Sequence, residues 1–181
     1  MSLGPSLNLW VGDNGAGKTS VLEAVSILSS GRSFVTSRSK AVITFDKPGL
    51  TVFGCVRGES RSHRLAIHVG REDERKLRLD GLTARGQAAL SRVLPVLYIT
   101  PHTTDLISGS PSIRRRFLDW GAFHWSGGSS SYFTSLKRAI LQRNAVLRDG
   151  ILDLSVLEPW DAQIASYGEV IDDWRKTFWI A

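Results

Sequence analysis

The sequence predicts an α/β fold in which a glycine-rich loop is followed by an antiparallel sheet and then by helices. Three observations support it: a phosphate-loop pattern at 12–19, a succession of short apolar runs at 41–80, and amphipathic helical periodicity in the second half. The chain has 181 residues, of which 42% are apolar, so it is long enough to bury a core. We therefore expect one domain built of two lobes, residues 1–105 and 106–181.

The segment GDNGAGKTS at residues 12–20 fits the pattern G-x-x-x-x-G-K-[ST] of a phosphate-binding loop. Its glycines let the backbone turn tightly and point N–H groups at an anion. An apolar run at 7–11 indicates a buried strand and a helix begins near Lys18, which gives the strand, loop and helix order that the motif requires. Lys18 is expected to reach the β- and γ-phosphates of ATP, and Thr19 to ligate Mg²⁺. The expected nucleotide contacts are Gly12, Asp13, Asn14, Gly15, Ala16, Gly17, Lys18, Thr19 and Ser20.

Residues 41–80 indicate short strands rather than alternating strands and helices. The runs AVITF, TVFGCVR, RLAIHVG and KLRLD follow one another with short turn-rich breaks between them, which favours an antiparallel meander. A small metabolite kinase of this length would instead continue as βαβ units on a parallel sheet. The pattern therefore favours a P-loop NTPase of the ABC-ATPase type, a head with an antiparallel β segment and a helical second lobe.

The second half of the chain is predicted to be helical after one more buried strand at 96–100. Ser110 is placed as the N-cap of the next helix, with Pro111 at its first position. Ser155 and Glu158 form a capping-box pattern before the last helix. We expect two apolar stripes, of which the second marks a core face more often than a partner surface: Phe133, Leu136, Ile140 and Leu147 in a helix closing at Gly150, and then Trp160, Ile164, Tyr167, Ile171, Trp174 and Phe178.

The charge and the cysteine content indicate which partners and which cellular compartment to expect. The net charge is +6, and residues 61–120 hold eleven Lys and Arg against six Asp and Glu, whereas residues 121–181 hold six against seven. Such a segment indicates either a polyanion partner or a solvated arginine-rich surface. The single Cys55 forms no internal disulfide, no apolar run reaches the ~18 residues of a membrane span, and no signal peptide precedes the loop. We therefore expect a cytoplasmic protein without a membrane partner.

Several further motifs extend across the chain. They are GDNGAGKTSVLEA, GRSF at 31–34, ITP at 99–101, LISGSPSIRRRFLDWG at 106–121, LKRAILQRNAVLR and PWD at 159–161. Together they resemble the RecF family of bacterial recombination-mediator ATPases, and the GSP-x-x-RR-x-FLDW block is far more specific than the phosphate loop. The likeness covers nearly the whole chain but only the amino-terminal half of a RecF protein.

The resemblance implies an ATP-dependent DNA-binding protein of recombinational repair, replication and the SOS response, which loads RecA at gaps. It implies ATP and Mg²⁺ as cofactors, double-stranded or gapped DNA as a partner, an ATP-dependent homodimer, and mediators of the RecR and RecO type. The predicted DNA contacts lie on the polar face of the QRNA helix: Lys137, Arg138 and Arg143. A small-molecule P-loop kinase, and a nucleotide- or DNA-binding module without turnover, remain as alternatives.

The chain departs from the family pattern in elements needed for hydrolysis. No Walker B strand is evident, because FD at 45–46 precedes a turn and IDD at 171–173 lies in the helical stripe, while SGGS at 126–129 reads as a linker rather than an ABC signature. We expect no ATP hydrolysis by this chain alone.

Individual positions depart as well. Val35 and His102 stand where the family has basic and acidic residues. Arg114, Arg115 and Arg116 splay over about 200° of a helix, so that one can pair with Asp119, one reach phosphate and one pack.

Overall fold

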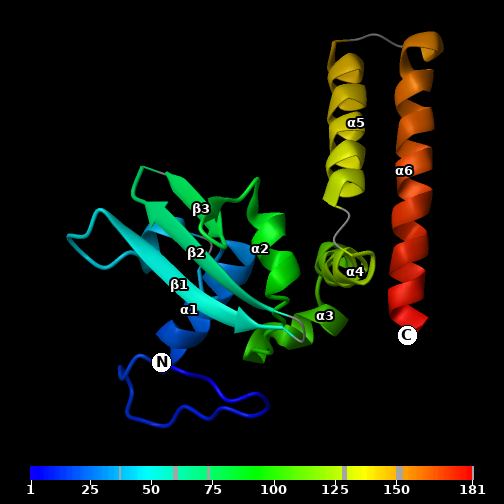
Figure 1. The fold of residues 1–181 in the computed structure, drawn as a ribbon. Coiled ribbons are helices and arrows are strands. Elements are labelled where there is room, and N and C mark those ends of the chain that lie inside the picture. Colours follow the sequence, from blue (N-terminus) through cyan, green and yellow to red (C-terminus); the bar gives the residue numbers. More distant parts are fainter. Residues whose placement is uncertain (37, 59–60, 73, 128–129, 150–152, 181) are drawn as a thin grey trace. The chain divides into compact units, whose positions relative to one another are not determined.

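The structure is a computed structural model that describes the chain except for residues 37, 59–60, 73, 128–129, 150–152 and 181 and the side chains of residues 39, 40 and 102. It divides into two compact units, Met1–Leu97 and Tyr98–Ala181 (Figure 1). The first holds the phosphate loop and the sheet, and the second is helical. The division falls upstream of residue 105, where the sequence placed the end of the first lobe.

The first unit contains a four-stranded antiparallel sheet in the order β1-β2-β3-β4 (Figure 1). Its strands are β1 (Gly49–Arg57), β2 (Ser62–Gly70), β3 (Arg75–Leu79) and β4 (Leu82–Thr83). The predicted meander is therefore confirmed for three of its four runs. Strand β4 was not predicted, although the Asp80–Gly81 pair before it, with φ of 53° and 86°, is a strong signal for a two-residue hairpin turn.

The first predicted run, AVITF, is not a strand. It is replaced by the 3₁₀ helix η1 (Ser39–Val42) and a turn in which Asp46 has a φ of 61°. The side chain of Arg71 donates to the carbonyl oxygens of Lys47 at 2.6 Å and Thr44 at 3.0 Å. The N–H of Lys47 also donates to the carbonyl of Thr44 at 3.1 Å, so the segment closes into a turn instead of continuing as a strand.

Two helices cover one face of the sheet, α1 (Lys18–Ser30) and α2 (Gln87–Val93). The core between them consists of Ile27, Leu28, Leu65, Ile67, Val69 and Leu90. The end of α1 is held by α2, because Gln87 Nε2 and Ser91 Oγ both donate to the carbonyl of Ser29 at 2.6 Å. This anchoring fixes the axis of α1, and with it the position of the loop at the amino end of that helix.

The second unit consists of η2 (Pro101–Thr104), α3 (Asp105–Ser108), α4 (Pro111–Trp125), α5 (Ser130–Arg148) and α6 (Leu154–Ile180). Helices α5 and α6 lie side by side (Figure 1). The predicted start of α4 is confirmed, since Ser110 is extended and Pro111 opens the helix. The predicted end of α5 at Gly150 lies outside the described residues.

The aromatic stripe of α6 is a packing face, as the core interpretation predicted. Ile171 is fully buried, the Trp174 ring lies 5.2 Å from Tyr132 of α5, and the Phe178 ring lies 5.9 Å from Phe117 of α4. On α5 the prediction is less accurate, because Ala139 is buried while Ile140 is 39% exposed. A small residue at the buried position of Ala139 lets α5 and α6 approach closely, and the larger Ile140 lies at the edge of the contact, where it is partly exposed.

Three local predictions are wrong. The expected strands at 7–11 and 96–100 are irregular and largely exposed, with Leu7 and Ile99 at 87% and 84%. In the described part of the chain no strand pairs with either run, and an apolar run forms a buried strand only when neighbours take its hydrogen bonds and cover its side chains. The capping box is also wrong, because α6 already begins at Leu154, and the Asp153 carboxylate accepts both the backbone N–H of Ser155 at 2.8 Å and its hydroxyl at 2.7 Å.

Candidate nucleotide-binding site

The candidate site is the loop at the amino end of α1. Gly15 and Gly17 have φ of 84° and 85°, a left-handed conformation that glycine adopts without steric cost. Gly17 is the N-cap of the 13-residue helix α1, no side chain caps it, and its first turn holds no acidic residue. Free backbone N–H groups and the helix dipole therefore favour an anion at this end of α1.

Lys18 contributes the positive charge of the loop. Its Nζ donates to the carbonyl oxygens of Gly12 at 2.6 Å and of Asp13 at 2.7 Å, so that the side chain curls back over the loop. The loop is closed from within by the N–H of Ala16, which donates to the carbonyl of Asp13 at 3.2 Å. The ammonium group thus lies over the same turn that presents the helix N-terminus.

The predicted nucleotide contacts form one continuous and accessible segment. Residues 12–16, Thr19 and Ser20 are exposed, and Gly17 and Lys18 are half-buried. The Thr19 hydroxyl lies in the first turn of α1, directly after the loop, and can take a metal ligand position beside a phosphate. The donor set of backbone N–H groups, one ammonium and one hydroxyl fits a magnesium triphosphate.

Neither of the acidic segments considered for a Walker B element ends a buried strand. Asp46 follows Phe45 in a turn, and Phe45 is 86% exposed rather than part of a buried strand. Asp172 lies in α6, where its carboxylate pairs with Lys176 at 2.7 Å. Ser126 and Gly127 of the SGGS segment form a turn after α4, and residues 128–129 lie outside the described part of the chain.

The GRSF segment is attached to α1 by a contact that the sequence did not suggest. The Ser33 hydroxyl donates to the carboxylate of Glu23, and its oxygen accepts the backbone N–H groups of Val35 at 2.9 Å and Thr36 at 3.1 Å. The Val35 side chain is 60% exposed. Ser33 therefore ties the segment after α1 back to the middle of the helix that carries the loop.

The predicted DNA contacts on α5 do not share one environment. Lys137 and Arg138 are exposed, whereas Arg143 is half-buried and its Nε lies 2.5 Å from a carboxylate oxygen of Asp161 on α6. Of the three, Lys137 and Arg138 present exposed cationic side chains on α5. The guanidinium group of Arg143 is engaged in an ion pair with Asp161 of α6.

The arginines before the FLDW segment mostly bind the backbone near them. Arg114 Nη1 donates to the carbonyl of Gly109 at 3.0 Å, and Arg116 Nε donates to that of Ser112 at 3.4 Å. The expected pairing of one of these arginines with Asp119 is wrong, because Arg175 of α6 pairs with that carboxylate. The side chain of His102 lies outside the described residues.

Comparison with known proteins finds relatives that carry one name. The chain is 40% identical over 179 residues to the DNA replication and repair protein RecF of Pseudomonas syringae pv. syringae, covering 98% of this chain and 49% of that protein. It is 41% identical over 175 residues to RecF of Pseudomonas fluorescens, covering 96% and 48%. The chain thus spans about half the length of the curated relatives that it matches. Comparison with models of protein families finds no match.

The fold gives the same result. A solved structure of the recombination mediator protein RecF-ATP in the RecFOR pathway matches with a TM-score of 0.76 and 25% identity, over 91% of this chain and 45% of that one. The structure of RecF-ATPrS matches with a TM-score of 0.75. The predicted fold class and the predicted resemblance to RecF are therefore confirmed. In the described part of the chain, none of the helices combines the length and apolar character of a membrane span.

Proposed function

We propose that this chain is the nucleotide-binding part of a RecF-type protein that binds ATP and DNA in recombinational repair and replication. The observation that supports this most is the uncapped, glycine-opened N-terminus of α1 beside Lys18, in a chain similar to RecF over 98% of its length. In this proposal residues 1–105 form the ATP-binding lobe and residues 106–181 the helical lobe, in a cytoplasmic protein.

The residues of the loop would divide the work of holding ATP and Mg²⁺. Backbone N–H groups from Gly12 to Gly17 would surround the phosphates, and Thr19 and Ser20 lie in the first turn of the helix behind them. Lys18 would exchange its bonds to the loop carbonyls for bonds to phosphate oxygens, which are stronger because both partners are charged. Mg²⁺ would be held through the Thr19 hydroxyl and would supply charge that neutralises the phosphates.

The proposed DNA contacts are Lys137 and Arg138, joined by Arg143 where its pair with Asp161 opens. Two exposed cations on one helix, with a third that can be released from its ion pair, suit phosphates and carry no base specificity. By similarity to the RecFOR protein, we further propose an ATP-dependent homodimer and partners of the RecR and RecO type. Double-stranded or gapped DNA is the proposed ligand of the assembled protein.

Nucleotide binding is tested by titrating the chain with a fluorescent ATP analogue in the presence of Mg²⁺. We expect Lys18→Ala to abolish measurable binding and Lys47→Ala, which removes an exposed lysine elsewhere in the same unit, to leave it unchanged. Circular dichroism of both variants checks that the fold persists. Equal affinity of the Lys18→Ala variant and the parent chain would contradict the proposed site.

Duplex binding is tested separately by titrating a short duplex at several salt concentrations. The double variant Lys137→Ala/Arg138→Ala should weaken binding and reduce the salt slope, by about 0.9 for each phosphate that the protein no longer neutralises. The control Arg38→Ala/Lys47→Ala removes the same charge from exposed positions of the first unit. If the two double variants behave alike, net charge rather than α5 determines binding.

A further inference from the structure

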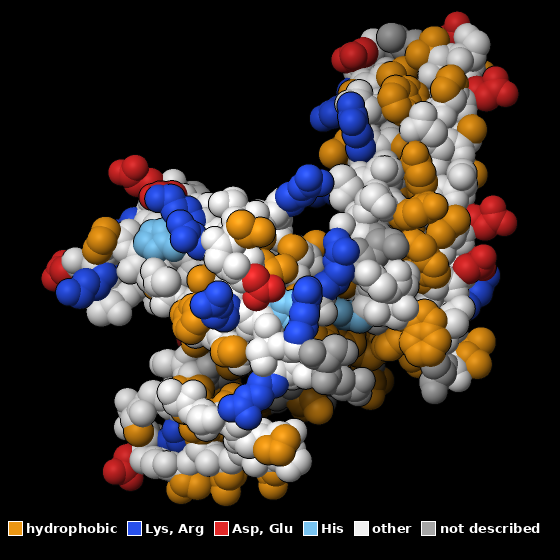
Figure 2. All heavy atoms as spheres, viewed as in Figure 1, with side chains coloured by type: hydrophobic (Ala, Val, Ile, Leu, Met, Phe, Trp, Pro, Cys, Tyr) orange, Lys and Arg blue, Asp and Glu red, His pale blue; other side chains and the backbone are white. Residues whose placement is uncertain are grey.

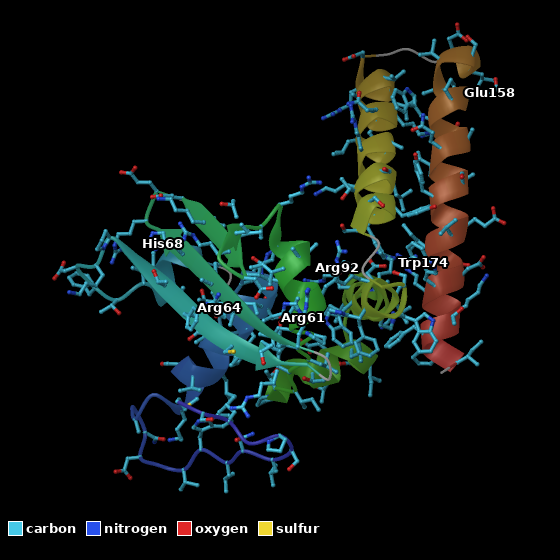
Figure 3. The ribbon with its side chains drawn as sticks, viewed as in Figure 1. Arg61, Arg64, His68, Arg92, Glu158 and Trp174 are labelled. Carbon is cyan, nitrogen blue, oxygen red and sulfur yellow. The ribbon has the colours of Figure 1, made fainter. Side chains whose placement is uncertain are left out.

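The face of the sheet that points away from α1 and α2 has no role in the site described above. Strand residues alternate between the two faces, and the buried face carries Leu65, Ile67 and Val69. The opposite positions, which we call the outer sheet face, are Thr51, Phe53, Cys55 and Arg57 of β1, Arg64, Ala66 and His68 of β2, and Lys76 and Arg78 of β3. All of these residues are exposed except Ala66 and His68, which are half-buried. Figure 3 labels Arg64 and His68 on this face.

The charge on the outer sheet face has one sign. Strands β1, β2 and β3 contain no Asp or Glu, while Arg57, Arg64 and Arg78 are exposed on the outer side. The positive charge of Lys76 is offset, because its Nζ pairs with a carboxylate oxygen of Glu74 at 2.7 Å at the start of β3. Figure 2 shows Lys and Arg side chains and a histidine over this part of the surface, with acidic side chains beside the histidine. Such a face favours a polyanion.

One large aromatic ring lies among these cations. Phe53 is 67% exposed, although a phenylalanine on a sheet is ordinarily covered by a neighbour. The strand register places Phe53 opposite Ala66, and Ala66 opposite Arg78, while Cys55 in the next outward position of β1 is opposite Arg64. Because Ala66 ends at a methyl group, it leaves the side of the Phe53 ring toward β2 open. Arg64 on β2 and Arg78 on β3 therefore lie on the same face as the uncovered Phe53 ring, both on the side of the ring toward β2 and β3.

We propose that the outer sheet face binds a single strand of nucleic acid, with an unpaired base stacked on Phe53 and phosphates held by Arg57, Arg64 and Arg78. An aromatic ring on a flat basic sheet binds the face of a base, which is a sequence-tolerant interaction. In a duplex the faces of the bases are stacked on one another, so a duplex uses only the cations. The combination of ring and cations thus selects the single strand. The inference extends the proposed DNA function, but its residues are separate from Lys18 and from α5.

The binding test uses the whole chain, without nucleotide, and a fluorescent oligothymidylate that forms no secondary structure. Phe53→Leu keeps an apolar side chain but removes the flat ring, and we expect it to weaken binding about tenfold. Phe53→Trp keeps a flat ring, and we expect it to bind oligothymidylate at least as tightly as the parent chain does. Arg64→Gln/Arg78→Gln should weaken binding and flatten its salt dependence, whereas Arg38→Gln/Lys47→Gln, with the same change in net charge, should not. Unchanged affinity in Phe53→Leu would overturn the proposal.

The location of the strand is tested by the only cysteine of the chain, because Cys55 is exposed between Phe53 and Arg57 on β1. Oligothymidylate should slow the alkylation of Cys55, and heparin, a polyanion without bases, should slow it less at equal occupancy. Absence of protection at saturating oligothymidylate would place the strand elsewhere and overturn the proposal. Self-association that Phe53→Leu abolishes, without oligothymidylate binding, would identify a protein contact instead and would also overturn it.

The outcome is independent of the proposed function. The Phe53 variants should bind ATP as tightly as the parent chain does, and they should also bind a duplex as tightly. Duplex binding is the property that the Lys137→Ala/Arg138→Ala variant tests. Failure of oligothymidylate binding with normal ATP and duplex binding rejects only the outer sheet face. Failure of ATP binding in the parent chain rejects the nucleotide site. The inference about the outer sheet face is then still decided by the oligothymidylate measurements.

Discussion

Arg175 of α6 pairs with Asp119 of α4 through two nitrogens, with Nε at 2.8 Å and Nη2 at 2.6 Å from the same carboxylate oxygen. The side chains of the two residues are 27% and 35% exposed, so the pair is only partly screened by water. It joins the last helix of the chain to the helix that carries the RRRFLDW segment. Asp119 is therefore a packing contact between helices rather than a partner of the neighbouring arginines.

We expect Asp119→Asn to lower the free energy of unfolding of the chain by about 1 kcal/mol, because Arg175 keeps its partial burial without its counter-charge. Urea unfolding followed by circular dichroism measures the change. The control is Asp172→Asn, which breaks an exposed pair with Lys176 on a single helix and should have a smaller effect. An equal effect of the two variants would mean that the α4–α6 pair contributes no more than a surface pair.

Gly121→Ala is expected to destabilise the second unit by about 1–3 kcal/mol. A Cβ at this buried position would overlap the ring of Phe178, so α4 and α6 would have to separate. Gly168 in α6 is the matched control, since a Cβ there meets nothing within 4 Å. Gly168→Ala should raise stability by about 0.5–1 kcal/mol through helix propensity alone. Thermal unfolding of both variants compares them, and a stabilising Gly121→Ala would contradict the close helix contact.

Asp153→Ala should lower the unfolding midpoint of the chain because it removes the acceptor at the start of α6. Hydrogen bonds from the hydroxyl and the backbone N–H of Ser155 hold the pKa of the Asp153 carboxyl below its ordinary value of 3.8. A depressed pKa contributes stability above 3.8 that disappears as the pH falls through the lower folded value, so the gap between variant and parent should narrow in acid.

Glu158→Ala distinguishes this cap from the predicted capping box. Glu158 is exposed, and we expect its removal to leave the unfolding midpoint unchanged at neutral pH. A decrease as large as that of Asp153→Ala would restore the capping box of Ser155 and Glu158. Urea unfolding at two pH values measures both variants.

ATP hydrolysis by the isolated chain should be negligible even where ATP binds. In-line attack on the γ-phosphate needs a positioned water and a second carboxylate near the metal, and the described residues place Asp46 in a turn and Asp172 in an ion pair. Phosphate release is measured in the presence of Mg²⁺, with Lys18→Ala as the control. Turnover near the ~10 s⁻¹ typical of enzymes, abolished in that variant, would reveal a further acidic group that serves the metal.

The parts of the fold that the sequence predicted are those whose signals are local. The loop, α1, the three longer strands and the start of α4 follow from glycine spacing, alternation and the Ser110–Pro111 pair. The strands expected at 7–11 and 96–100 failed because an apolar run does not state whether neighbouring strands are present to pair with it.

The candidate site shows the same division. Spacing alone identified residues 12–20 as one segment, because the motif is continuous in the chain. The bond of Ser33 to Glu23 and the choice of Arg175 as the partner of Asp119 depend on the distance between elements, which no sequence periodicity reports. The Asp80–Gly81 turn is the exception, since its dipeptide is a readable hairpin signal from which β4 could have been predicted.

The nine-residue strand β1 lies at one end of the sheet order, and within the described residues only β2 pairs with it. Its other edge therefore presents backbone N–H and C=O groups along a strand that contains no proline and only one charged residue, Arg57 at its end. Natural proteins commonly protect such an edge with lysines, prolines or a bulge. We therefore expect concentrated solutions of this chain to aggregate by pairing of strands, and we expect a lysine introduced at the exposed Thr51 to reduce this aggregation.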